Sequence, residues 1–180
     1  MAEPRTIAVL ADCHIHPGGG IAWPQPALER LAGADMIITL GDMGESVGLD
    51  TLETIAPVVG VKGQDDQDDP RSAPAARLVQ AGGLRIGCVF DPVEQGLAVS
   101  KDPFVAADAA AEAEARLFGG PVDVLLCAST HIPSIHDGPS RLVIDPGSVT
   151  LPTGKETGAP GTFARLVLEN GKARAEIVEV

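Results

Sequence analysis

The stretch of residues 7–14, IAVLADCH, constrains this chain more than any other part of the sequence. An apolar run of this length is typical of a buried strand. It ends in Asp12 and His14, and a glycine-rich loop follows at residues 17–20. Side chains at the end of a buried strand are held rigidly, as metal ligands must be. Because Mn, Fe and Zn accept mixed oxygen and nitrogen donors, Asp12 and His14 are candidate metal ligands.

The first third of the chain alternates between short apolar runs and helical segments. We predict helices at residues 27–31 and 49–56, separating strands at residues 6–11, 35–40 and 58–61. This order favours right-handed crossovers and a parallel sheet. The carboxyl ends of parallel strands meet at one edge of a sheet, where open α/β sheets carry their sites.

The rest of the chain predicts mostly antiparallel strands. The clearest helix is residues 104–118, with Asp102 as its N-cap and Pro103 after it. A strand is expected at residues 122–127, and hairpins pair residues 77–80 with 84–90, 132–136 with 141–144, and 161–168 with 173–180. The last hairpin turns through Asn170-Gly171, a strong hairpin signal. We therefore expect one α/β domain over residues 1–180, with two packed mixed β-sheets flanked by helices.

The charge and the composition argue against several classes of function. The net charge is −12, aromatic residues make up 3% of the chain, and tyrosine is absent. Such a chain repels phosphate backbones and lacks stacking platforms for bases, so non-specific nucleic-acid binding is not expected. The sequence has no stretch of membrane-spanning length, and we expect no signal peptide, because its first residues lack the basic start and apolar core of one. The number and spacing of its three cysteines argue against a disulfide framework, so we expect a cytoplasmic protein. We also expect that it does not enter a membrane.

Further candidate ligands follow other predicted strands. Four side chains in such positions could together hold one dication and leave open positions for water or substrate: Asp12, His14, Asp42 and His131. A bound dication lowers the pKa of water from about 15.7 towards about 7, which provides hydroxide at neutral pH. It also offsets charge on phosphate oxygens, so phosphate esters suit this chemistry.

These residues resemble the motifs of the calcineurin-like metallophosphoesterases, specifically the small bacterial and archaeal phosphodiesterase branch, whose compact fold the retromer scaffold subunit of eukaryotes shares. The resemblance runs from Thr6 to about Val180 and implies an α/β/β/α sandwich. The Asp-x-His motif is met by Asp12 and His14, and the Gly-Asp motif by Asp42. Four later motifs are met in part, by Gly63-Gln64-Asp65-Asp66, Phe90-Asp91-Pro92, Ala128-Ser129-Thr130-His131 and Asp145-Pro146-Gly147-Ser148.

The resemblance implies two metal positions, of which this chain keeps the whole ligand set of one. That set is Asp12, His14, Asp42 and His131. The other position shares Asp42, but its three remaining ligands are replaced by Gln64, Phe90 and Ser129. A phenyl ring cannot bind a metal, and a serine hydroxyl is a poor ligand for these metals. We therefore expect one ion rather than two, unless a second is restored by Asp65, Asp66 or Asp91.

Our first hypothesis is a metal-dependent phosphoesterase that hydrolyses a small phosphodiester by metal-bound hydroxide. The ion is expected to be Mn, with Fe, Ni and Zn as alternatives. The residues expected to take part in catalysis are Asp42, Gln64 and Asp65. The sequence leaves the substrate and the oligomeric state open.

Our second hypothesis is a catalytically inactive binding or scaffold protein on the same fold, with a protein partner. The four ligand residues would then be remnants satisfied by hydrogen bonds. In both hypotheses Phe90 fills the core and Cys13 is buried and inert. Gly147 and Ser148 form a turn that supports the site, and His16 and His136 lie at the surface or behind the ligands.

Overall fold

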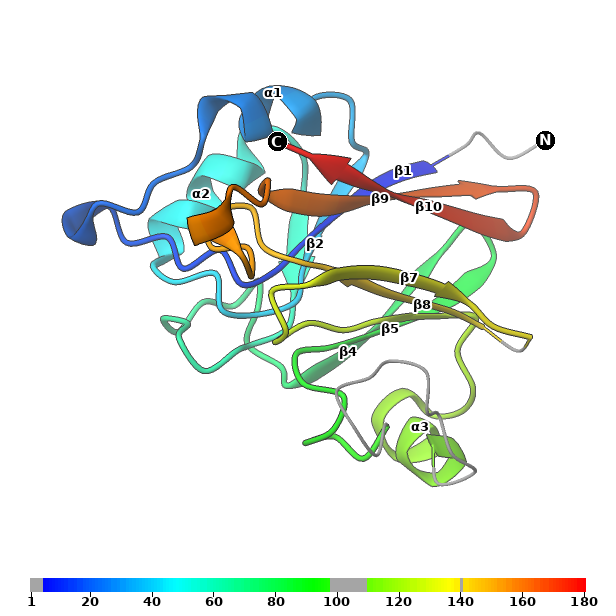
Figure 1. Cartoon of the computed structure of the whole chain (residues 1–180). Coiled ribbons are helices and arrows are strands. Elements are labelled where there is room, and N and C mark those ends of the chain that lie inside the picture. Colours follow the sequence, from blue (N-terminus) through cyan, green and yellow to red (C-terminus); the bar gives the residue numbers. More distant parts are fainter. Residues whose placement is uncertain (1–4, 98–109, 140) are drawn as a thin grey trace.

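Two five-stranded sheets pack face to face in the computed structural model, which describes residues 5–97, 110–139 and 141–180 (Figure 1). The first sheet has the order β10-β9-β1-β2-β3, with β1 (Arg5–Leu10), β2 (Met36–Thr39), β3 (Val58–Gly60), β9 (Thr162–Glu169) and β10 (Lys172–Glu179). The second has the order β4-β5-β6-β8-β7, with β4 (Ala76–Ala81), β5 (Leu84–Val89), β6 (Val124–Leu126), β7 (Pro133–Asp137) and β8 (Leu142–Pro146). The predicted pair of mixed sheets is confirmed.

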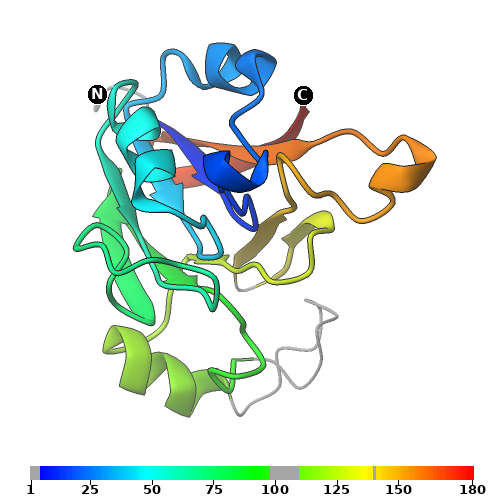
Figure 2. The ribbon, with the colours of Figure 1, turned by 90° about the vertical axis from the view of Figure 1, so that its left-hand side faces the viewer.

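Helices cover the outer faces of both sheets. The first sheet is covered by α1 (Gln25–Leu31) and α2 (Ser46–Glu53), and the second by α3 (Ala110–Phe118), as the two views in Figures 1 and 2 show. The start of the helix predicted at residues 104–118, with its N-cap Asp102, falls outside the described residues. The model thus gives the α/β/β/α order of layers that the resemblance implied.

The helix predicted at residues 49–56 lies three residues earlier in the chain, as α2. Gly48 sits inside this helix because a Cβ there would be 3.1 Å from the Ile15 side chain, so glycine lets the helix pack closely on the site loop. The helix ends at Glu53 and a turn follows before Pro57, because the residue before a proline disfavours helical geometry.

Strand β1 is buried on both faces, which explains its unbroken apolar run. Ile7 and Val9 face the core between the two sheets, whereas Ala8 and Leu10 face α1 and α2. β1 is parallel to β2, and β2 to β3, as predicted from the alternating helices. The three carboxyl ends therefore lie side by side at one edge of the sheet.

The last two strands form the predicted hairpin. β9 pairs antiparallel with β10 and also with β1, so it joins the C-terminal hairpin to the central parallel strands. Asn170 and Gly171 both have positive φ, 52° and 70°, as a tight hairpin turn of this type requires. No helix in the described residues is long and apolar enough to cross a membrane.

Candidate metal centre

Strand ends from both sheets meet at one site. Asp12 follows β1, Asp42 follows β2, and Asp65 lies beyond β3. His131 follows β6 of the second sheet. The backbone N–H of Ser129 donates to Asp12 Oδ2 at 3.1 Å and links the two sheets at this point. The structure thus brings together the four residues expected as ligands.

The backbone of the site is held in an uncommon conformation. Among the described residues, six other than glycine have positive φ, and five of these belong to the site: Asp12, His14, Asp42, Ser129 and His131. Their φ values lie between 46° and 75°, in the left-handed region. Asparagine, aspartate and histidine enter this region more readily than most residues, but the conformation is still costly. Such strain gathers where a structure must aim side chains at one point.

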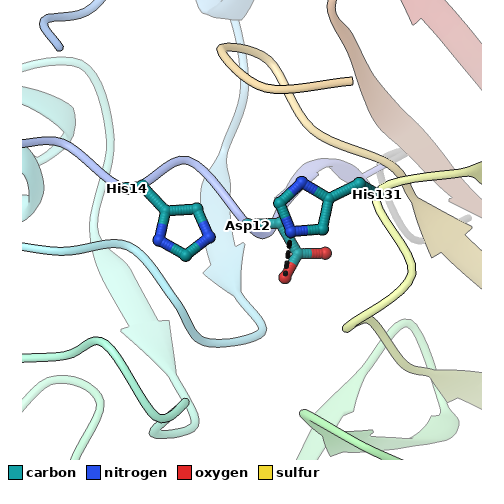
Figure 3. A group of neighbouring side chains, drawn as sticks. All are labelled: Asp12, His14 and His131. Carbon is teal, nitrogen blue, oxygen red and sulfur yellow. Dashed lines mark ion pairs between the residues drawn. The ribbon is translucent and has the colours of Figure 1, made fainter. Parts of the chain in front are cut away.

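Asp12 is fully buried, and one of its oxygens has no hydrogen-bond donor. Oδ2 accepts the Ser129 N–H, whereas Oδ1 accepts no hydrogen bond and makes a 3.8 Å ion-pair contact with His131 Nε2 (Figure 3). Burial, followed by the nearby Asp42 carboxylate, raises the pKa of Asp12 to about 7. A buried carboxylate oxygen without a donor costs free energy unless a cation or proton meets it.

His131 and His14 both direct Nε2 into the site. Nδ1 of His131 lies 2.7 Å from the backbone oxygen of Leu151, and Nδ1 of His14 lies 2.7 Å from Asp65 Oδ2. An acceptor at Nδ1 places the proton on that nitrogen and leaves the lone pair on Nε2. The two rings stack with centroids 5.4 Å apart (Figure 3). One ligand atom each of Asp12, His14 and His131 lies within 4.8 Å of the others.

Asp42 lies next to His14, outside the group of three ligand atoms just described. Its Oδ2 lies 3.8 Å from His14 Nε2, and its Oδ1 accepts the backbone N–H of Asp65 at 2.8 Å. The second bond fixes the carboxylate and ties the end of β2 to the loop after β3. Asp42 therefore lies where it can share a cation with His14.

The loop of residues 63–66 is organised by Asp66. Its carboxylate accepts four backbone N–H groups, those of Asp42, Met43, Gly44 and Gly63, at 2.6–3.1 Å. These bonds use both oxygens, so Asp66 acts as a brace for the loops after β2 and β3. Burial raises its pKa, an effect that the amide bonds partly offset.

Asp65 joins two imidazoles. Its Oδ2 lies 2.7 Å from His14 Nδ1 and 2.8 Å from His16 Nε2. The hydrogen bonds with His16 and then His14 lower the pKa of Asp65, so it is a charged carboxylate near neutral pH. The same contact raises the pKa of His16. No sequence pattern predicts the pairing of His16 with Asp65, because 49 residues separate them.

Three residues stand where the resemblance implies the remaining ligands of the other metal position: Gln64, Phe90 and Ser129. The Gln64 amide nitrogen donates to Glu94 at 3.3 Å. Phe90 is 9% exposed and packs in the core between the sheets. Ser129 has a buried, unpartnered hydroxyl. Asp91 Oδ1 accepts the backbone N–H groups of the next turn, those of Val93 and Glu94.

The turn after β8 supports the site from behind. Ser148 Oγ donates to the backbone oxygen of Asp12 at 2.6 Å, and Thr150 Oγ1 donates to that of Cys13. Asp145 Oδ2 accepts the Thr130 hydroxyl at 2.7 Å, and burial raises the pKa of Asp145 to about 7. The predicted support from Ser148 is present in the structure, whereas Thr150 was missed because it belongs to no motif. Cys13 is buried, as predicted.

Comparison with known proteins identifies the family. The profile described as the calcineurin-like phosphoesterase superfamily domain matches residues 6–171. The chain belongs to the calcineurin-like phosphoesterase superfamily. A probable metallophosphoesterase of Methanocaldococcus jannaschii is 29% identical over 148 residues, which cover 81% of this chain and 69% of that protein.

Solved structures that resemble this superfamily member include eukaryotic proteins. Vacuolar Protein Sorting 29 from Cryptosporidium parvum matches with a TM-score of 0.69 and 21% identity, covering 98% of both chains. Vps29 from Entamoeba histolytica, solved in complex with Zn²⁺, matches with a TM-score of 0.65 and 22% identity, covering 97% of this chain and 98% of that one. At 21–22% sequence identity, these two matches show that the chain shares the fold of Vps29.

Membership of the calcineurin-like superfamily implies a divalent metal, and the residues of the inner site fit one. By inner site we mean Asp12, His14, Asp42 and His131. They supply two imidazole nitrogens and two carboxylates, a donor set that Mn, Fe and Zn accept. The unpartnered Oδ1 of Asp12 and the two Nε2 atoms converge on one point, as ligands of a single ion would.

Proposed function

We propose that this chain is a metal-dependent phosphodiesterase that works with one divalent ion in the inner site. The observation that carries the proposal is the buried Oδ1 of Asp12, which faces His131 Nε2 and has no hydrogen-bond donor. If the site no longer bound a metal, we would expect a hydrogen-bond donor of the protein to contact this oxygen. We propose Mn as the ion, with Fe, Ni and Zn as alternatives.

A bound divalent ion would activate water by lowering its pKa and would offset negative charge on the phosphate. The protein's own residues place the ligands. The Ser129 N–H donates to Asp12 Oδ2 and so links the second sheet to the first, and Asp42 is fixed by the Asp65 N–H at 2.8 Å. The positive φ values set the direction of each ligand before an ion arrives.

Asp65 and Gln64 have separate parts in this proposal. Asp65 holds the proton of His14 on Nδ1, so that Nε2 remains a ligand. Because hydrogen bonds lower its pKa, Asp65 is poorly suited to donate a proton to a leaving group near neutral pH, so we assign it a positioning role. Gln64 lies in the same loop, and its amide is our candidate for binding a phosphate oxygen of the substrate.

The proposal is tested by hydrolysis of bis(p-nitrophenyl) phosphate after reconstitution with Mn²⁺. Asp42→Asn should lower kcat/KM by at least about 100-fold, because the amide loses the charge that binds the ion. Asparagine tolerates the positive φ of Asp42, so the fold should persist. Asp137→Asn, which changes an exposed aspartate at the end of β7, is the matched control and should retain activity.

A second candidate function is a binding or scaffold protein without catalysis. The observation in its favour is that Phe90 packs in the core and the amide nitrogen of Gln64 donates to Glu94. Neither residue then acts as one of the further metal ligands that the resemblance implies. The likeness to Vps29, named for vacuolar protein sorting, is compatible with a protein partner. Absence of turnover with Mn, Fe, Ni and Zn in a folded protein would support this candidate and refute the phosphodiesterase.

A further inference from the structure

The two nitrogens of the His14 ring face different partners. Nε2 faces Asp42 in the inner site, and Nδ1 faces Asp65. His16, two residues further on, directs Nε2 at the same oxygen of Asp65 from 2.8 Å. Three of the four histidines of the chain therefore lie near one another, since His131 stacks on His14 and His16 is two residues from it. The outer side of His14 is therefore a second place where imidazoles and a carboxylate meet.

These three side chains have the arrangement of a cation site. One ligand atom each of His14, His16 and Asp65 lies within 4.8 Å of the other two. Two imidazoles with one carboxylate form a donor set that zinc uses in open, three-residue sites. The Glu45 carboxylate lies 3.4 Å from His16 Nδ1, where it can orient the ring from behind, as carboxylates do for metal-binding histidines.

The three side chains stand on a backbone that is fixed before any ion binds. His16 exchanges two backbone hydrogen bonds with Ile21, at 2.9 and 3.1 Å. The N–H of His14 donates to the backbone oxygen of Asp42 at 2.9 Å, and the N–H of Asp65 donates to the side chain of the same residue. Ligand positions of this kind need little rearrangement on binding. Because the Asp65 side chain is 44% exposed, the cluster opens to solvent.

We propose that His14, His16 and Asp65 form an outer site for a zinc-like divalent cation, distinct from the inner site. The outer site goes beyond the proposed function and shares two residues with it: His14, a ligand in both sites, and Asp65, which in the proposed function positions the His14 ring. The inner ion takes the lone pair of His14 Nε2, whereas the outer ion takes that of Nδ1. A neutral imidazole has a lone pair on only one of its nitrogens. The two sites therefore compete for His14, and an ion in one weakens binding in the other.

The test is a titration of the whole chain with Zn²⁺, followed by NMR of ¹⁵N-labelled histidine, since four histidines give a simple spectrum. The first zinc should shift His131 Nε2, because the inner site has two carboxylates. Further zinc should shift His16 Nε2, and His136, on β7, is the internal control. In His131→Ala the His16 response should move to lower zinc concentration, because the competing ion is gone.

Variants separate the outer site from the proposed function. Asp65→Asn should abolish the His16 response, whereas Asp68→Asn, in the same acidic loop, should keep it. A His16 signal that does not move even in large excess of zinc would overturn the outer site. A His16 response unchanged by His131→Ala would overturn the competition. Neither result would argue against the inner site. The inner site would be refuted by a His131 signal that does not respond to metal.

Discussion

His131 Nε2 lies 3.8 Å from the buried Oδ1 of Asp12, across the junction of the two sheets. Residues 119 positions apart in the chain thus meet at one point, and the sheets must be docked for that point to exist. An ion bound there would hold both sheets together and would bind the folded state alone. Metal binding and the stability of the fold are therefore coupled.

The first prediction concerns this coupling. Mn²⁺ at about 100 times its Kd should stabilise the chain by about 2.7 kcal/mol, which corresponds to a rise in Tm of about 5–10 °C. A chelator should reverse the rise, and His131→Ala should abolish it. Differential scanning calorimetry measures both, with His136→Gln as the variant that retains the full effect. An equal rise in His131→Ala would contradict an ion at the junction.

The second prediction concerns the brace at Asp66. Asp66→Ala removes the acceptor for four backbone N–H groups, so the free energy of unfolding should fall by about 3 kcal/mol or more. Metal affinity should fall as well, because the N–H of Asp42 loses its partner. Urea unfolding and metal titration measure the two effects.

The control for this brace lies two residues away. Asp68 is exposed and its carboxylate contacts only Lys62 among the described residues, so Asp68→Ala should leave the urea midpoint unchanged. If Asp66→Ala proved as harmless as Asp68→Ala, the loop of residues 63–66 would not depend on the brace.

The third prediction concerns the close approach of two loops at Gly63. A Cβ on Gly63 would overlap the backbone N and the carboxylate of Asp42. Gly63→Ala should therefore displace Asp42 and weaken metal binding at least about tenfold, with loss of stability. In Gly18→Ala the new Cβ meets no atom within 4 Å, so that variant should bind metal normally. Isothermal titration with Mn²⁺ compares them, and equal affinities would refute the displacement.

Periodicity was enough to predict the sheets, since β1 and β2 read as buried runs and Asn170-Gly171 marked the last hairpin. The strand-end argument predicts that Asp12, His14 and Asp42 lie together, because β1 and β2 are parallel and end at one edge. His131 follows a strand of the second sheet, so its place beside them depends on how the two sheets pack. The pairing of His16 with Asp65 escaped prediction, since it depends on how two loops fold over each other. Side-chain direction in such loops is set by individual φ values, which no periodic pattern encodes.

The last prediction concerns Asp145, a buried carboxyl in β8. Burial raises the pKa of this carboxyl to about 7, whereas an unfolded aspartate titrates near pH 4. Unfolding therefore releases a proton between these values, and the free energy of unfolding falls as pH rises from about 4 to about 7.

Asp145→Asn should remove this loss of stability, because asparagine does not titrate. The asparagine oxygen can still accept the Gly147 N–H, and the asparagine amide can donate to Thr130 Oγ1. The Thr130 hydroxyl can then donate its own proton to the backbone oxygen of Ile132. Thermal unfolding should show a variant more stable than wild type by about 4 kcal/mol at pH 8 and equal to it at pH 4. Asp137→Asn should show no such difference, and a gain for Asp145→Asn that is equal at both pH values would mean that the buried charge is not its cause.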